Sequence, residues 1–117
     1  MRRSVPLFRG RQACACRQPP FRFNDYETVE LGEDSRGADV SLSTCNACGT
    51  IWLTYRIDEP HYHRSGRWWR VDIAAADAST LSAATARDHV ERSPAGFVGG
   101  SFFDSPGRAV TAPITVR

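Results

Sequence analysis

The chain has four cysteines in two close pairs: Cys14 and Cys16 are separated by one residue, and Cys45 and Cys48 by two. Zinc prefers four ligands of this soft kind in a tetrahedron, with Zn–S distances of about 2.3 Å. Two thiolates on one tight turn supply half of that shell, and a second turn completes it. Gly49 follows the last cysteine and suits such a turn, because glycine adopts positive φ freely. The pattern predicts a structural metal site, since four protein ligands leave no open position.

Three other uses of the cysteines stay open in the sequence. Two disulfides would need an oxidising compartment, which no segment of the chain indicates. A redox Cys-x-x-Cys pair normally opens a helix that lowers the thiol pKa, whereas the pair at 45–48 precedes a strand pattern. An iron–sulfur cluster also uses four thiolates. We favour structural zinc, whose binding is worth an apparent ~10–16 kcal/mol in small peptides and couples the metal to folding.

The two cysteine pairs also carry a family resemblance. The stretches "CAC" at 14–16 and "CNACGTIWL" at 45–53, each leading towards a strand, resemble the paired knuckles of the zinc-ribbon group. In that group, two β-hairpin turns hold one zinc through four cysteines. The resemblance covers residues 14–57 and implies that all four cysteines are zinc ligands. It implies no particular activity, because zinc ribbons serve transcription, translation, protein docking and structural support.

Other groups capable of chemistry form no complete site in the sequence. His61 and His63 make a His-x-His pair in an expected loop, where solvent-exposed histidines are the usual case. Asp58 and Glu59 are adjacent, so on a strand their side chains would point to opposite faces. No Ser-His-Asp, phosphate-loop or dinucleotide-binding pattern is present. We therefore expect no enzymatic activity, with an enzyme site of unrecognised type as the weakest alternative.

The composition is that of an ordinary globular protein, with 117 residues, 41% hydrophobic and 24% charged. All 15 basic residues are arginine, and residues 1–24 contain several of them and no acid. We expect a flexible basic arm over 1–12 and a single zinc-stapled domain over 13–117. No apolar run approaches the ~18 residues that span a bilayer, and no secretory signal is visible. These features predict a cytoplasmic protein.

The elements that must position the cysteines follow from apolar periodicity. The clearest alternation is "TIWLTYRID" at 50–58, which predicts a strand. Further strands are predicted within 21–31 and at 40–44, 67–74 and 96–107, with an edge strand or a mobile tail beyond. The glycine pair inside 96–107 predicts a bulge or a close backbone approach. One helix is predicted over 77–92, capped by Asp77 or Ser79 and stopped by Ser93 and Pro94.

Together these elements predict an α+β fold: a small, mostly antiparallel sheet, stapled by zinc, with one helix packed on it. The face of the sheet expected to form the core is apolar on both central strands. It comprises Ile51, Leu53, Tyr55, Trp69, Val71 and Ile73. The opposite face comprises Trp52, Arg56, Trp68 and Arg70. This second face is either an exposed binding surface or is covered by the helix.

Tryptophan and arginine are the residues most enriched at binding hot spots. The sequence therefore favours a non-enzymatic binding module that presents Trp52, Arg56, Trp68 and Arg70 to a protein partner. A bacterial immunity-type or adaptor protein fits this size. The alternative is a nucleic-acid-binding zinc ribbon, in which aromatic rings stack on bases and the arginine-rich arm contacts phosphates.

Overall fold

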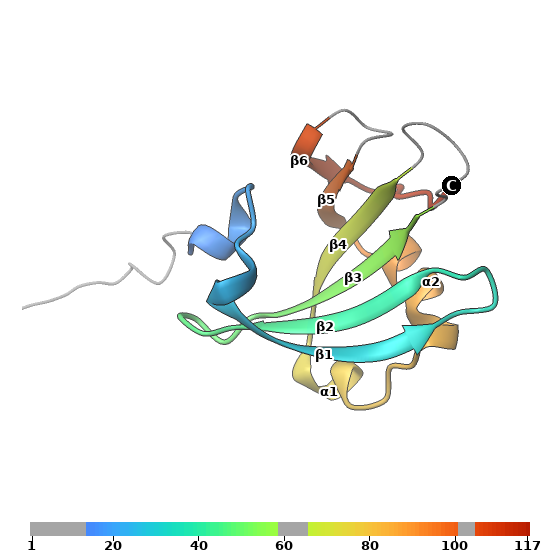
Figure 1. The fold of residues 1–117 in the computed structure, drawn as a ribbon, viewed down its shortest axis with the longest axis horizontal. Coiled ribbons are helices and arrows are strands. Elements are labelled where there is room, and N and C mark those ends of the chain that lie inside the picture. Colours follow the sequence, from blue (N-terminus) through green and yellow to red (C-terminus); the bar gives the residue numbers. More distant parts are fainter. Residues whose placement is uncertain (1–13, 59–65, 101–104) are drawn as a thin grey trace, which may run out of the picture.

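The computed structural model describes residues 14–58, 66–100 and 105–117. Within them the chain forms one antiparallel sheet in which sequence neighbours are also sheet neighbours, in the order β1-β2-β3-β4-β5-β6 (Figure 1). The strands are β1 (Tyr26–Glu33), β2 (Asp39–Cys45), β3 (Ile51–Ile57), β4 (Arg67–Ile73), β5 (Ala95–Gly100) and β6 (Ser105–Thr111). The expected small antiparallel sheet is therefore present.

The helical region is split, where the sequence predicted one helix over 77–92. Helix α1 (Ala75–Ala78) ends where the Ser79 and Thr80 hydroxyls donate to main-chain carbonyls one turn back. Helix α2 (Ala83–Arg92) then begins afresh at a capping box, in which the amide of Ser82 donates to the Thr85 hydroxyl at 3.1 Å. The predicted caps at Asp77 and Ser79 were wrong, because Ser82 caps the helix that packs on the sheet.

The face of the sheet under α2 forms the main core. Leu53, Tyr55 and Trp69 are at most 1% exposed there, and Val90 of α2 is fully buried against them. The core also contains Ala38, Val40, Ile57, Val71, Ile73, Ala86, Val98, Ile114 and Val116. Each fully buried aliphatic or aromatic side chain contributes about 1.5–3 kcal/mol. This confirms the predicted core face, except that Ile51 is only half-buried.

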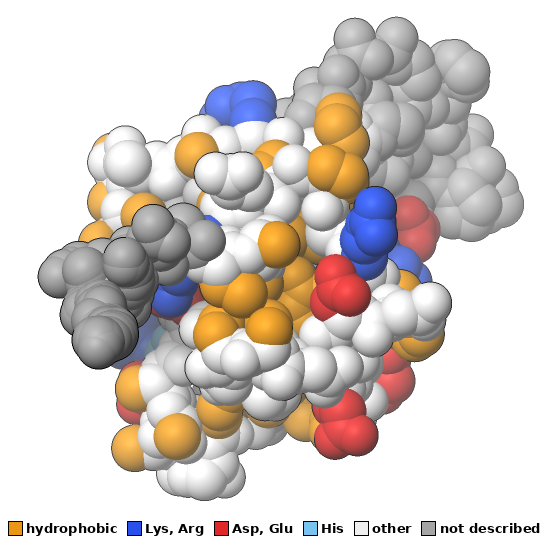
Figure 2. Space-filling view, turned by 90° about the vertical axis from the view of Figure 1, so that its left-hand side faces the viewer, with side chains coloured by type: hydrophobic (Ala, Val, Ile, Leu, Met, Phe, Trp, Pro, Cys, Tyr) orange, Lys and Arg blue, Asp and Glu red, His pale blue; other side chains and the backbone are white. Residues whose placement is uncertain are grey.

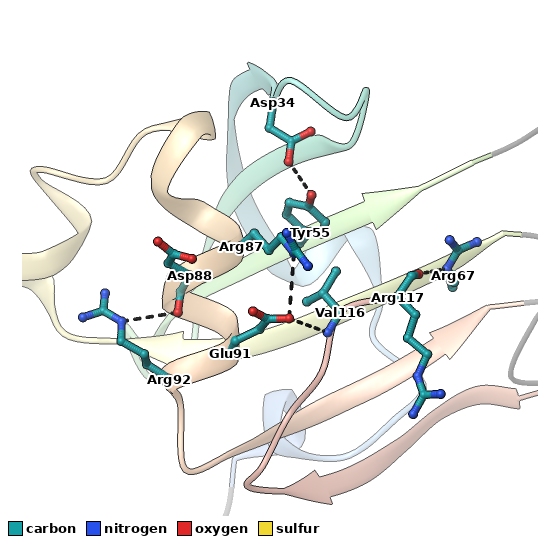
Figure 3. A network of polar contacts seen from close by, with 9 residues as sticks. All are labelled: Asp34, Tyr55, Arg67, Arg87, Asp88, Glu91, Arg92, Val116 and Arg117. Atoms are coloured by element: carbon teal, nitrogen blue, oxygen red, sulfur yellow. Dashed lines mark hydrogen bonds and ion pairs between the residues drawn. The ribbon is translucent and has the colours of Figure 1, made fainter.

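The last residues of the chain belong to this core. Beyond β6 the tail turns back, and Ile114 and Val116 are buried beside α2. The amide of Val116 donates to the Glu91 carboxylate at 2.8 Å, and Arg67 donates to the carbonyl of Arg117 (Figure 3). Of the two outcomes expected for this region, an edge strand or a mobile tail, the structure shows the edge strand β6. The residues after β6 are fixed by packing.

The segment expected to be a single strand at 96–107 is two strands, β5 and β6, joined through residues 101–104, which lie outside the described residues. The glycine pair does mark both a bulge and a close approach. The register shifts between Val98 and Gly100, and Gly100 has φ +111°. A Cβ on Gly99 would lie 2.4 Å from the ring of Trp68, so only glycine lets β5 approach that ring.

Residues 14–25, hereafter the N-terminal segment, lie against the sheet on the side away from α2 (Figure 1). Two short 3-10 turns, Ala15–Arg17 and Phe23–Asp25, are its only regular structure. The strand expected within 21–31 therefore begins only at Tyr26. The predicted arm over 1–12 and the pair His61 and His63 lie outside the described residues. No helix within the described ranges is long and apolar enough to cross a bilayer.

Candidate metal centre and the aromatic face beside it

Two turns carry the four cysteines. Cys14 and Cys16 flank the start of the first 3-10 turn, where the amide of Arg17 donates to the carbonyl of Cys14. Cys45 ends β2, and Cys48 lies in the turn to β3. The amide of Gly49 donates to the carbonyl of Cys45 at 2.9 Å, and its φ of +80° is the positive value predicted for it. The tight β2–β3 turn therefore holds two thiols on one side.

The four sulfur atoms lie together although the two pairs are far apart in sequence. Cys14 Sγ lies 3.8 Å from Cys45 Sγ, and Cys16 Sγ lies 3.6 Å from Cys48 Sγ. All four sulfurs are within 4.8 Å of one another. Around an ion at 2.3 Å, tetrahedral sulfurs would be about 3.8 Å apart, whereas a disulfide needs about 2.05 Å. The thiols are free, and their spacing suits a metal ion.

The four thiols differ in how deeply they are buried. Cys16 and Cys45 are 3% and 4% exposed, Cys14 is half-buried and Cys48 is exposed. Burial raises the pKa of the Cys16 thiol to about 12, while a hydrogen bond with the Thr50 hydroxyl lowers the pKa of Cys48 to about 6. Metal binding requires thiolates. A cation at the centre would supply the positive charge that compensates a buried, negatively charged thiolate.

Trp52 forms the wall of this centre on the sheet side. It is 1% exposed and packs in one cluster with Cys16 and Cys45. Its buried indole N–H has no hydrogen-bond partner of normal geometry, but it acts on the Cys16 thiol and lowers that pKa, against the larger effect of burial. Trp52 thus packs against the two buried cysteines, Cys16 and Cys45.

The four residues predicted to face a partner are not equally accessible. Trp52 and Arg70 are 1% and 6% exposed, Trp68 is half-buried, and Arg56 is exposed. The expectation of an open face is wrong for Trp52 and Arg70, because the N-terminal segment covers them. The alternative, that the helix covers this face, is also wrong, since α2 packs on the other one. Arg56 pairs with Asp39 at 3.6 Å and with Asp58 at 3.3 Å.

Phe21 of the N-terminal segment is the residue that closes this face. Its ring centroid lies 5.2 Å from that of Phe97, 6.0 Å from that of Trp68 and 6.4 Å from that of Trp52. Figure 2 views the side of the molecule on which the segment lies in Figure 1, and hydrophobic side chains gather at its centre. Phe21 was expected in the strand predicted within 21–31, whereas the structure places it before the second 3-10 turn, with its ring packed over this face.

The guanidinium of Arg70 lies inside this group of rings. Its Cζ is 4.1 Å from the ring centroid of Phe21, 4.6 Å from that of Trp52 and 4.7 Å from that of Tyr26. Cation–π contacts of this kind are worth up to about 2 kcal/mol when desolvated. Burial lowers the Arg70 pKa, and its Nε and Nη2 have no hydrogen-bond partner. Arg70 is therefore a buried cation with unused donors.

The comparisons with known proteins add no relative. No protein-family model matches the chain, and no curated protein or solved structure is found to match it. The likeness to zinc ribbons therefore rests on the four clustered cysteines and the turns that carry them.

Proposed function

We propose that this protein is a non-enzymatic binding module whose fold is stapled by one structural zinc ion. The observation that carries the proposal is the meeting of four thiols, from turns 31 residues apart, within 4.8 Å of one another. Cys14, Cys16, Cys45 and Cys48 would be the ligands. Four sulfur ligands close the coordination shell, so the ion would contribute stability and not a reaction.

The ion would fix the N-terminal segment to the sheet. Besides the ring packing of Phe21, polar contacts tie the segment there: Arg17 pairs with Asp72 at 3.2 Å in an exposed position, and the amide of Asn46 donates to the carbonyl of Asp25. Exposed ion pairs contribute about 0–1 kcal/mol. The metal would therefore act together with this ring packing to keep Phe21 over Trp52 and Arg70.

The surface that we propose for a protein partner, hereafter the docking face, comprises Phe23, Arg56 and Trp68. Phe23 is 79% exposed and lies on the second turn of the N-terminal segment. Arg56 and Trp68 are directly paired across β3 and β4, so they share a side of the sheet. An exposed and a half-buried aromatic side chain with a neighbouring arginine are the composition of a binding hot spot. An adaptor or immunity-type protein would work in this way, by presenting a rigid face.

The test is capture of partners from the native host by zinc-loaded protein, followed by mass spectrometry, with and without nuclease. Phe23→Ser should lose the captured protein, while Val29→Ser, a matched change of a 60% exposed residue, should retain it. Equal capture by both variants would contradict the docking face. Capture that disappears with nuclease and falls steeply with salt would favour the nucleic-acid alternative.

A further inference from the structure

A cavity of about 380 Å³ lies between the N-terminal segment and the sheet. Phe21, Tyr26, Thr54, Arg56, Trp68 and Arg70 are among the residues that line it. It is distinct from the metal centre, since no cysteine lines it. Its size is in the range of small-molecule sites, which combine apolar walls with a few polar groups.

The cavity is positively charged. Three arginines line it, Arg22, Arg56 and Arg70, and no aspartate or glutamate does. Arg56 shares its charge with two carboxylates, but Arg70 has no carboxylate partner among the described residues. A cation in such an apolar surround favours an anionic occupant, because solvent screening is weak there.

Three hydroxyl groups form a polar floor beside this charge. Thr28 and Ser43 are directly paired across β1 and β2, with their hydroxyl oxygens 3.0 Å apart. Thr54 is directly paired with Arg70 across β3 and β4, which places both side chains on the cavity side of the sheet. Hydroxyls can donate to an oxyanion, so the floor adds donors of the kind that bind carboxylate or phosphate oxygens.

The guanidinium of Arg70 supplies the strongest reason to expect a ligand. Three aromatic rings lie around it; Tyr26 also acts on it through a side-chain hydrogen bond, and Cys16 and Cys45 act through their charge, but ring faces accept no conventional hydrogen bond. Nε and Nη2 are therefore left unpartnered in a side chain that is only 6% exposed. Leaving buried donors unpaired costs about 1–3 kcal/mol, and more for charged groups. Both nitrogens are closed off from solvent as the rings stand, so a planar oxyanion would satisfy the two donors at once when the rings shift to admit it.

We propose that this cavity binds an oxyanion attached to an apolar or aromatic body. Arg70 would hold the charge, the Thr54 hydroxyl would donate to it, and the rings of Phe21 and Trp68 would contact the body. A carboxylate and a phosphate monoester share this chemistry. The proposal goes beyond the protein-binding function and needs only that the N-terminal segment is in place.

The test is a titration of the full, zinc-loaded chain, followed by NMR of the backbone amides and the Arg70 Nε–H. The probes are benzoate, phenyl phosphate and, as the uncharged control, benzyl alcohol, all at constant ionic strength. Saturable shifts at Thr54 and Arg70 are expected with the two anions and not with the alcohol. Tighter benzoate binding would identify a carboxylate site, and tighter phenyl phosphate binding a phosphate site. Equal binding of benzyl alcohol would overturn the proposal.

Two variants complete the test. Thr54→Val keeps the side-chain volume and should weaken anion binding about tenfold, the effect of losing one hydrogen bond to a charged group. Arg70→Lys keeps the charge but loses the planar fork and should weaken it at least as much. Arg92→Gln, on the exposed side of α2, should bind like the parent.

Unchanged affinity in Thr54→Val would overturn the proposal even if Arg70→Lys fails to fold. Because zinc content is checked in every sample, and partner capture is measured separately, failure here is distinguishable from failure of the binding-module proposal.

Discussion

The two faces of the sheet are closed in different ways. Under α2, the cover is a ten-residue helix with its own capping box, and the contacts are aliphatic and aromatic. On the other face, the cover is the N-terminal segment, whose regular structure is two three-residue turns. There the buried groups are thiols, aromatic rings and one guanidinium. One face is thus held by apolar burial, and the other brings together four thiols that could hold a metal ion.

Each of the two central strands, β3 and β4, contributes side chains to both faces. In β3, Leu53 lies in the helix-side core, while its neighbour Trp52 lies against the cysteines. In β4, Val71 lies in the core, while Arg70 lies among the rings of the opposite face. Alternation alone would leave one of these faces in water. A strand that is buried on both sides therefore needs a second cover, which here is the N-terminal segment that carries Cys14 and Cys16.

The largest effect is expected from Cys45→Ser. It removes one ligand, so the chain should lose its metal and its cooperative unfolding transition, because structural zinc sites couple binding to folding with an apparent ~10–16 kcal/mol. The buried indole of Trp52 should become exposed, which a red shift of tryptophan fluorescence would report. Retention of one ion per variant chain, with unshifted fluorescence, would count against the coordination proposed above.

Leu53→Ala tests the helix-side core. This side chain is fully buried, and its truncation should lower the free energy of unfolding by about 2–5 kcal/mol, measured by urea denaturation. The zinc content should not change, since Leu53 lies in the other cluster. If the metal content of this variant fell along with its stability, the two faces would not be independent of each other.

Gly99→Ala tests the close packing of β5 on the aromatic face. The new Cβ would lie 2.4 Å from the Trp68 ring, and we expect a loss of about 1–3 kcal/mol together with a changed fluorescence of that ring. Gly37→Ala is the control, because a Cβ there meets nothing within 4 Å, although its φ of +82° adds backbone strain. A Trp68 signal that responds equally to both variants would argue against the contact.

The smallest effect concerns Asp34, at the end of β1. Partial burial acts to raise its pKa, but hydrogen bonds from Tyr55 and from the amides of Ala38 and Arg36 outweigh it and lower the pKa. Because the folded pKa lies below the unfolded value of about 3.9, this stabilisation is complete above that pH and is lost as the pH falls through the folded pKa.

Asp34→Asn should therefore lower stability by about 1 kcal/mol near neutral pH. The difference from the parent should shrink below about pH 4, as urea denaturation at several pH values would show. Tyr55 remains a neutral donor throughout, because burial and its bond to Asp34 raise its pKa to about 12. A difference that is constant with pH would mean that the charge of Asp34 contributes nothing.

The sequence predicted the parts of the fold that repeat along the chain. Period-two alternation located β3 and β4 and the core side chains Leu53, Tyr55 and Trp69. The spacing of the cysteines predicted the cluster of four thiols, since the ligand types and the following glycine are all local signals. These features are marked by residues close together in the sequence, so a single sequence is enough to predict them.

What the sequence did not predict depends on long-range packing. Phe21 was expected in a strand within 21–31, and nothing local indicated that it would lie outside the strand and cover Arg70. The break between α1 and α2 depends on the competition between Ser79 and Ser82 for the capping position, which composition alone does not decide. The second cover of the sheet was therefore missed, although the residues beneath it were correctly placed on one face.

Whether the four thiols share one zinc ion is tested by the metal content of the purified chain, measured by elemental analysis together with native mass spectrometry. We expect about one zinc per chain, with all four thiols unreactive until a chelator is added. Protein that is folded without metal, that contains iron with visible absorbance, or whose mass corresponds to two disulfides would contradict it.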